Sequence, residues 1–295
     1  MASSLARVIN NDQTSPVSRT VLALIRASHP EPAVAVTLVA ALLAGGIGHG
    51  PSATARVAST VLASQLAVGW LNDRLDAARD AAVGRPDKPI ATGAVSGRVV
   101  GLAGLVTALA TPALGLTLNP VAAGCAAIGL GSALLYNWPL KAAPISPLPY
   151  AVSFGSLPAF VVLALPGSPA PPAWLVAAGA LLGAGAHFAN ALPDLVDDLR
   201  TGIRGLPQRI GPTGSWLTAA GLLLAATVVL VLGPPGPPSW SGLIAAAAAI
   251  VVLTVGWYAS RATAARGARP VGVFRAVMLV AIIDVVLLVT SGRVV

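Results

Sequence analysis

The sequence contains little charge. Asp, Glu, Lys and Arg make up 9% of its 295 residues, whereas soluble globular proteins carry about 25%. Hydrophobic residues make up 56% of the chain, and the mean hydropathy is +0.81. Apolar runs recur along the chain, with lengths close to the roughly 20 residues that a helix needs to cross the hydrocarbon core. This composition excludes a soluble globular protein and predicts an all-α integral membrane protein.

Other features are scarce or missing as well. The single cysteine, Cys125, excludes a disulfide within the chain. Residues 1–19 have no apolar core beside their first basic residue, so we expect no cleaved signal peptide. The alternating segments typical of a membrane β-barrel are absent from the sequence. The net charge of +8 indicates basic cytoplasmic loops rather than a nucleic-acid partner.

The apolar runs predict nine transmembrane helices in a single domain, residues 1–295. Residues 1–30 form an N-terminal cytoplasmic or interfacial segment, with a short interfacial helix expected over 16–28, and residues 31–290 form the bundle. The expected spans are, approximately, 31–49, 53–72, 98–117, 120–136, 147–166, 172–193, 214–233, 240–259 and 271–290. A cytoplasmic N-terminus leaves only two of the 18 Lys and Arg residues outside, which supports this topology.

Most of the acidic residues gather in two clusters, each at the cytoplasmic end of an expected span. The pattern N-x-x-x-D-x-x-x-D occurs from Asn72 to Asp80 and again from Asn190 to Asp198. This spacing places the three side chains on one face of a helix. Like charges one helical turn apart repel, and bound Mg²⁺, shared with phosphate oxygens, would remove that repulsion. The doubled pattern therefore predicts two Mg²⁺ ions with a diphosphate between them.

Basic residues near the two clusters can meet the remaining phosphate charge. The candidates for diphosphate binding are Arg85, Lys88, Lys141 and Arg204. The alternative is that the clusters are solvated helices held by salt bridges. We assign Arg74 and Arg79 to that alternative. We do not assign to it the two patterns Asn72–Asp80 and Asn190–Asp198, the first and second acidic ladders, because acids aligned on one helix face repel one another unless a cation lies between them.

At these motifs the sequence resembles the UbiA superfamily of intramembrane prenyltransferases. The segment "NDRLDAARD" is similar to the family's NDxxDxxxD motif, and "DLVDD" to its DxxxD motif. The segments "RPDKPIATG", "GIRGLPQRIG" and "YNWPLK" also resemble family segments. The resemblance implies a nine-helix bundle with an active site near the cytoplasmic face of the cell membrane. It implies two Mg²⁺ ions, held by Asn72, Asp76, Asp80, Asp194 and Asp198.

The reaction that the resemblance implies is transfer of an isoprenoid group from a prenyl diphosphate to an acceptor, with release of diphosphate. The metals act as Lewis acids on the leaving diphosphate, the allylic bond ionises, and the acceptor captures the carbocation. The hydrophobic tail lies in a groove that opens to lipid. The acceptor remains open among aromatic acids, quinone precursors, tetrapyrroles, sugar phosphates and glycerol phosphates.

Further polar residues close to the motifs are candidates for roles in the reaction. Asp73 is a candidate catalytic or metal-binding residue, with a salt-bridge role as the alternative. His187 is a candidate for orienting or deprotonating the acceptor, with an interhelical hydrogen bond as the alternative. The candidate substrate-binding residues are Arg26, Tyr136, Asn137 and Asn190, of which Arg26 matches a family arginine associated with the substrate pocket.

Two other functions compete with prenyl transfer. A terpene cyclase on the same scaffold would capture the carbocation within its own chain. Cyclases steer cations with aromatic faces, and the low aromatic content, 4%, disfavours one here. A transporter is a remote alternative, because transporter sites lie near the bilayer midplane and these acids stand at span ends.

Overall fold

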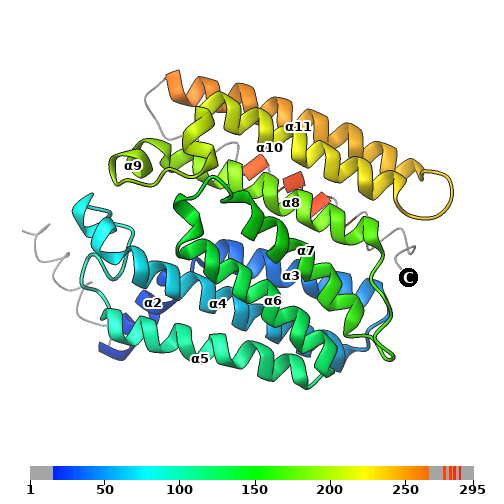
Figure 1. Ribbon diagram of the computed structural model, residues 1–295, viewed down its shortest axis with the longest axis horizontal. Coiled ribbons are helices and arrows are strands. Elements are labelled where there is room, and N and C mark those ends of the chain that lie inside the picture. The colour runs from blue at the N-terminus through cyan, green and yellow to red at the C-terminus, as the bar shows by residue number, and fades with distance from the viewer. Residues whose placement is uncertain (1–15, 266–274, 277–278, 281, 284–285, 287–295) are drawn as a thin grey trace, which may run out of the picture.

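The computed structural model describes residues 16–265, 275–276, 279–280, 282–283 and 286. Within these residues the chain forms helices and no strands (Figure 1). The elements are α2 (Pro16–Ala27), α3 (Pro30–Gly46), α4 (Pro51–Ala82), α5 (Gly97–Leu116), α6 (Pro120–Asn137), η1 (Leu140–Ala142), α7 (Pro147–Leu163), α8 (Ala173–Ala191), η2 (Leu192–Asp194), α9 (Leu195–Arg200), α10 (Leu206–Leu232) and α11 (Trp240–Ala265). The all-helical prediction is confirmed.

The long helices follow the expected spans. Helices α3 to α8, α10 and α11 each overlap one span predicted between residues 31 and 259. Five stretches are long and apolar enough to cross a membrane: α5, α6, α8 with its extension to Arg200, α10 and most of α11. The bent pair of α2 and α3 makes a sixth if it is counted as one broken span. The ninth expected span, 271–290, lies mostly outside the described residues.

Helix α4 extends beyond its expected end at residue 72 and continues to Ala82. The extra turns carry the first acidic ladder, so this part of the helix projects polar side chains at the end of the bundle. The turn that follows contains Gly84, whose φ of +66° is left-handed and therefore suited to glycine. Ser96 then starts α5, where its hydroxyl accepts a hydrogen bond from the Val99 amide at 3.3 Å.

The helices lie roughly side by side along the long axis of the molecule (Figure 1). Helix α4 packs against α3, α5 and α6, while α8 packs between α7 and α10, and α11 lies against α10. Helix α9 and the C-terminal turns of α4 lie at the same end of the bundle (Figure 1). This arrangement brings together the two acidic clusters, which are more than 100 residues apart in sequence.

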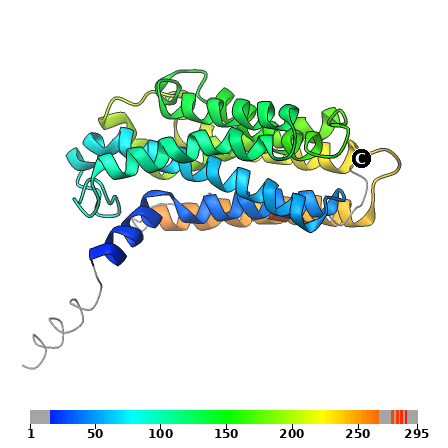
Figure 2. The same cartoon turned by 90° about the horizontal axis from the view of Figure 1, so that it is seen from below.

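The chain bends sharply between α2 and α3 (Figure 2). The two helices meet at an angle of 66°. His29 occupies the bend with a left-handed backbone, φ 54° and ψ 65°. The Trp70 indole of α4 donates a hydrogen bond to the Leu24 carbonyl at 2.8 Å, which ties α2 to the bundle. A short helix over residues 16–28 is thus confirmed.

Candidate functional site

A cavity of about 510 Å³ connects the two acidic clusters with the apolar interior of the bundle. Its polar end is lined by Asn72, Asp76, Arg79, Asp80, Arg85, Asp87, Lys88, Tyr136, Asn137, Lys141, Asn190, Asp194, Asp197 and Asp198. The remainder is lined by apolar side chains, among them Val39, Leu43, Leu157, Leu175, Leu182 and Leu230. One cavity therefore joins a highly charged mouth to a space suited to a hydrocarbon chain.

The first ladder lies on continuous α-helix, as its spacing predicts. Asn72, Asp76 and Asp80 of α4 all line the cavity. Asp76 Oδ2 accepts hydrogen bonds from Arg79 Nη2 at 2.6 Å and from Lys141 Nζ at 2.9 Å. Arg79, which we assigned from sequence to surface salt bridges, therefore lies inside the site.

The second ladder does not lie on continuous α-helix, and the expectation of a matching second helix face is wrong in this respect. Helix α8 ends at Ala191, the chain forms the 3₁₀ turn η2, and α9 begins at Leu195. Pro193 lies in this turn and has no amide hydrogen to continue an α-helical ladder. Asn190, Asp194 and Asp198 nevertheless all line the cavity.

Arg85 connects the two clusters. It donates hydrogen bonds from Nε and Nη2 to the two carboxylate oxygens of Asp87, at 3.0 and 2.9 Å. Its Nη1 reaches Asp194 Oδ1 of the second motif at 3.4 Å. The hydrogen bonds from Arg85 lower the pKa of Asp87 to about 2, so this carboxylate stays charged at neutral pH.

Lys88 is buried, with 9% of its surface exposed, and does not reach out as a free cation. Its Nζ donates to Asp73 Oδ1 at 3.1 Å and lies 3.2 Å from His29 Nε2. Asp80 Oδ2 is 3.9 Å from the same nitrogen. Asp73 is 1% exposed and is absent from the cavity lining, so it contacts Lys88 rather than the cavity.

Asp198 is held by a residue that we did not single out from the sequence. Gln208, near the start of α10, donates a hydrogen bond from Nε2 to Asp198 Oδ2 at 2.8 Å. The signal was present, because Gln208 belongs to the family-like segment "GIRGLPQRIG". Only the fold places this segment beside α9. His29 was likewise missed, since nothing in the sequence places it beside Lys88.

Aromatic side chains surround His187 beside the cavity. Its ring centroid lies 5.3 Å from that of Tyr136 and 5.0 Å from that of Tyr150. His187 is 2% exposed, does not line the cavity, and lies with Nε2 3.0 Å from Ser146 Oγ. The structure therefore shows the contact of the packing alternative, because Ser146 precedes α7 whereas His187 belongs to α8.

The predicted substrate-binding residues fall into two groups. Tyr136, Asn137 and Asn190 line the cavity. The amide of Asn137 donates to the Val68 carbonyl at 3.0 Å, and that of Asn190 points to the Tyr150 hydroxyl at 3.5 Å. Two arginines lie apart from the cavity. Arg26 is exposed on α2, and Arg204 is exposed in the loop before α10.

The carboxylates that line the cavity offer oxygen donors suited to Mg²⁺. Among the described residues, no three His, Cys, Asp or Glu side chains converge as a metal-binding group. Mg²⁺ needs no such cage, because it commonly takes one or two carboxylates together with water and substrate phosphate oxygens. Asp80 Oδ2 is buried without a hydrogen-bond partner among the described residues, and Lys88 Nζ, at 3.9 Å, lies beyond hydrogen-bond distance, so a closer cation would stabilise this oxygen. These donors are compatible with Mg²⁺ bound together with a diphosphate.

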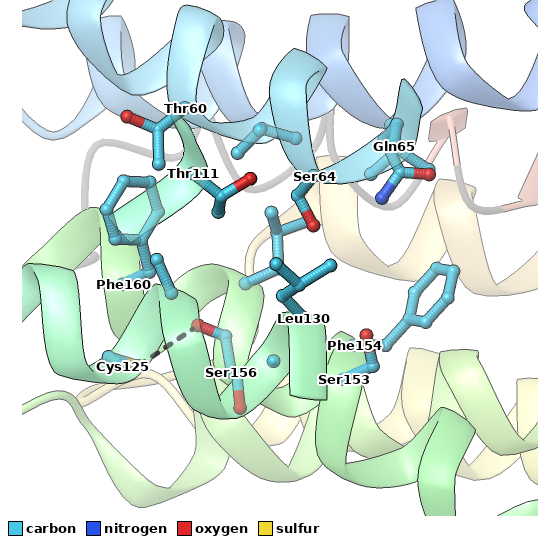
Figure 3. A pocket seen from close by; sticks show the side chains of 15 residues that line it. Thr60, Ser64, Gln65, Thr111, Cys125, Leu130, Ser153, Phe154, Ser156 and Phe160 are labelled. Carbon is cyan, nitrogen blue, oxygen red and sulfur yellow. Dashed lines mark hydrogen bonds between the residues drawn. The ribbon is translucent and has the colours of Figure 1, made fainter. Parts of the chain in front are cut away.

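A second pocket of about 50 Å³ adjoins the main cavity within the bundle (Figure 3). Gln65, Ser153 and Phe154 line both spaces. Thr60 and Thr111 also line the pocket, and each hydroxyl donates to a carbonyl one turn earlier in its own helix. Apolar side chains such as Val61, Leu130 and Phe160 line the rest of the pocket, so it is a small space of mixed polarity beside the main cavity.

Comparison with known proteins gives a consistent result. Residues 33–282 match the UbiA prenyltransferase family. The digeranylgeranylglyceryl phosphate synthase of Halobacterium salinarum is 28% identical over 239 residues, which cover 80% of this chain and 85% of the relative. The bacteriochlorophyll synthase 33 kDa chain of Cereibacter sphaeroides is 29% identical over 196 residues, which cover 62% of each chain.

Solved structures share the fold. A UbiA homologue from Aeropyrum pernix, in its apo form, superposes with a TM-score of 0.69 at 21% identity, covering 90% of this chain and 98% of that chain. A UbiA homologue from Archaeoglobus fulgidus, bound to GPP and Mg²⁺, gives 0.68 at 14% identity, covering 92% of this chain and all of that chain. From its sequence match, its fold and its apolar helices, we conclude that this chain is a multi-pass membrane enzyme of the UbiA prenyltransferase family.

Proposed function

We propose that this protein catalyses Mg²⁺-dependent transfer of an isoprenoid group from a prenyl diphosphate to an acceptor within the membrane, releasing diphosphate. The observation that supports this proposal most is the shared cavity. Carboxylates from α4 and from the η2–α9 segment line one charged mouth, and the same space continues among apolar side chains. A prenyl diphosphate has the same division, with a charged head and a hydrocarbon tail.

The five residues carried over from the family motifs would hold two Mg²⁺ ions. These residues are Asn72, Asp76, Asp80, Asp194 and Asp198, all of which line the cavity. When bound, Mg²⁺ would neutralise charge on the departing diphosphate oxygens. Carboxylates from α4 and from the η2–α9 segment would share the charge of the two ions.

The bases of the site would bind phosphate oxygens. Lys141 and Arg79 contact Asp76, and Arg85 contacts Asp194. A carboxylate that binds a cation no longer needs these partners, so their N–H groups become available to phosphate. Charge-assisted hydrogen bonds of this kind are about twice as strong as neutral ones. We assign diphosphate binding to Arg85 and Lys141, add Arg79, and leave out Arg204, which does not line the cavity.

Three other predicted roles are assigned by position. Asp73 is a positioning residue that fixes Lys88, since it contacts Lys88 and not the cavity. His187 is a packing and positioning residue behind Tyr136 and Tyr150. Arg26 is exposed on α2, and we assign it to the interface between protein and lipid headgroups rather than to substrate.

The substrate tail would lie along the apolar wall of the cavity, where Leu43, Leu175 and Leu230 provide apolar surface. The reaction centre would then lie beside Tyr136 and Asn190, between the charged mouth and the tail. The excess of Lys and Arg at this end of the bundle supports a cytoplasmic orientation for the mouth. The names of two relatives supply two acceptor types, a glycerol-phosphate lipid and a tetrapyrrole, for a screen.

Binding of geranyl diphosphate (GPP) to purified protein in detergent tests the metal-dependent clamp. We expect tight binding with Mg²⁺ and at least about tenfold weaker binding with a chelator, because the carboxylates then repel the diphosphate. Equal affinity under both conditions would contradict the clamp. The product distinguishes the functions: an acceptor adduct indicates transfer, and a cyclic hydrocarbon or alcohol indicates a cyclase.

A further inference from the structure

His29, Lys88 and Asp73 form a chain of polar contacts that runs from the cavity wall, which His29 and Lys88 line, to the buried Asp73. Lys88 Nζ lies 3.1 Å from Asp73 Oδ1 and 3.2 Å from His29 Nε2. The backbone before His29 is pressed against α4, because a Cβ on Gly69 would overlap the Ser28 carbonyl. The main chain beside His29 is therefore held close to α4, and Lys88 contacts the His29 ring.

These contacts determine which nitrogen of His29 carries its proton. Lys88 Nζ donates to Asp73 Oδ1 and lies between this oxygen and His29 Nε2, and an ammonium group has donors only. His29 Nε2 must accept from it, so Nε2 has no proton. A doubly protonated ring is disfavoured as well, because it would place a second N–H against the ammonium group. The neutral ring that remains carries its proton on Nδ1.

The Nδ1–H group is available to a ligand. His29 lines the cavity with Asn72, Asp76 and Arg85. Within the described residues Nδ1 has no hydrogen-bond partner, and it is not among the fully buried unpaired atoms. The α3 helix makes no use of it, since His29 precedes this helix without a side-chain capping bond. The backbone conformation of His29, φ 54°, is uncommon for a non-glycine residue and is frequent at binding sites.

We propose that His29 is a specificity-determining residue that donates a hydrogen bond from Nδ1 to an anionic oxygen of the bound substrate. The ligand is a phosphate or carboxylate oxygen, and it belongs either to the prenyl diphosphate or to the acceptor. Asp73 and Lys88 act behind His29 as positioning residues that hold its tautomer. This inference rests on the proposed function for the identity of the substrate.

The tautomer is measurable without any substrate. The chain has three histidines, so long-range ¹H–¹⁵N spectra of ¹⁵N-histidine-labelled protein resolve each ring, and His29→Asn assigns the His29 signals. His49 is an internal standard for the opposite tautomer, because its Nε2 donates to the Val161 carbonyl at 2.9 Å. We expect His29 to be neutral and protonated on Nδ1. Protonation on Nε2, or on both nitrogens, would overturn the proposal.

Two substitutions then test the donor. His29→Gly removes the side chain and fits a left-handed backbone. His29→Asn places an amide N–H near the Nδ1 position and also tolerates this backbone. We expect the glycine variant to bind the ligand roughly ten- to a hundredfold more weakly, the usual effect of losing a hydrogen bond to a charged group, and asparagine to restore most of the affinity.

The ligand is assigned from two binding measurements. The first uses GPP with Mg²⁺, and the second uses glycerol phosphate and 4-hydroxybenzoate with inorganic diphosphate and Mg²⁺ already bound. If His29→Gly weakens the binding of GPP, the partner of His29 is the diphosphate. If it weakens the binding of glycerol phosphate or 4-hydroxybenzoate, the partner is the acceptor. The proposal would be overturned if the unsubstituted protein and both variants bound the ligands equally in both measurements. It would also be overturned if His29→Asn bound no more tightly than His29→Gly. Absence of GPP binding by the unsubstituted protein would instead contradict the proposed function, while the spectra still decide the tautomer.

Discussion

Arg85 and Asp194 join the two acidic clusters directly. Arg85 Nη1 lies 3.4 Å from Asp194 Oδ1, although 109 positions separate the residues in sequence. The other guanidinium donors of Arg85 are held by Asp87. The two motifs thus form one charged site. Substitution of a carboxylate in either motif should therefore affect the binding of the same ligand.

Loss of one carboxylate from either motif should abolish diphosphate release. We expect Asp76→Asn and Asp194→Asn each to reduce Mg²⁺-dependent release from GPP on the order of a hundredfold or more, since a preorganised charge at the reacting group is lost. Pyrophosphate release and thermal unfolding would be measured together. Glu31→Gln, an exposed carboxylate outside the cavity, is the matched control. Full activity in either cavity variant would contradict the two-motif site.

The buried pair of Asp73 and Lys88 should show strong coupling in stability. Lys88→Met leaves a 1% exposed carboxylate without its counter-ion, a change that typically costs about 3–5 kcal/mol. The double variant Asp73→Leu/Lys88→Met removes both charges and should recover much of the lost thermal stability. Unfolding in detergent of both single variants and the double variant gives the coupling. If the stability losses of the two single variants simply add in the double variant, Asp73 and Lys88 do not stabilise the fold as a coupled pair.

Much of the site was predictable because its chemistry lies in local patterns. The spacing of Asn72, Asp76 and Asp80 predicts one face of a helix, and α4 places all three on the cavity wall. Charged residues at the end of an apolar span also indicate a membrane boundary. In these positions the chemistry follows from which residues share a helix face.

The remainder depended on contacts between distant segments. Lys88 is held by Asp73 and by His29, which lies 59 positions away in sequence. No local pattern in the sequence indicates that Lys88 is buried. The helix break at Pro193, in contrast, had a local signal in the sequence. Its missing N–H was visible in the sequence, yet the repeated spacing suggested a continuous helix. Asp198 still lines the cavity, where Gln208 from the start of α10 donates a hydrogen bond to it.

Gln208 should support catalysis through Asp198. Replacing it by leucine removes the 2.8 Å hydrogen bond to Asp198 Oδ2. Residues that hold a metal ligand typically contribute tenfold to a hundredfold in affinity or activity, so we expect roughly that loss in kcat/KM for GPP and a higher Mg²⁺ requirement. Arg209→Gln is the control, because Arg209 is exposed and, within the described part of the chain, its guanidinium hydrogen-bonds to the backbone carbonyl of Arg204 and to no cavity residue. An unchanged Mg²⁺ requirement for Gln208→Leu would argue against this role.

The close packing of α7 on α8 requires glycine at position 183. A Cβ on Gly183 would overlap Phe154 and lie 2.6 Å from the Tyr150 carbonyl oxygen. We expect Gly183→Ala to lower stability by about 1–3 kcal/mol, as overpacking does, and to disturb the cavity wall formed by Tyr150. Gly221→Ala in α10 has no atom within 4 Å of its new Cβ and should be neutral. Equal thermal unfolding of the two variants would contradict the close contact.

Product formation from GPP tests the proposed reaction most directly. Purified protein in detergent with Mg²⁺ would be given GPP, with and without a pool of glycerol-phosphate, aromatic-acid and tetrapyrrole acceptors, and diphosphate and organic products would be analysed. We predict acceptor-dependent diphosphate release and a prenylated acceptor, both lost in Asp76→Asn. Unchanged GPP in every mixture, or a cyclic product formed without an acceptor, would contradict prenyl transfer as the function of this cavity.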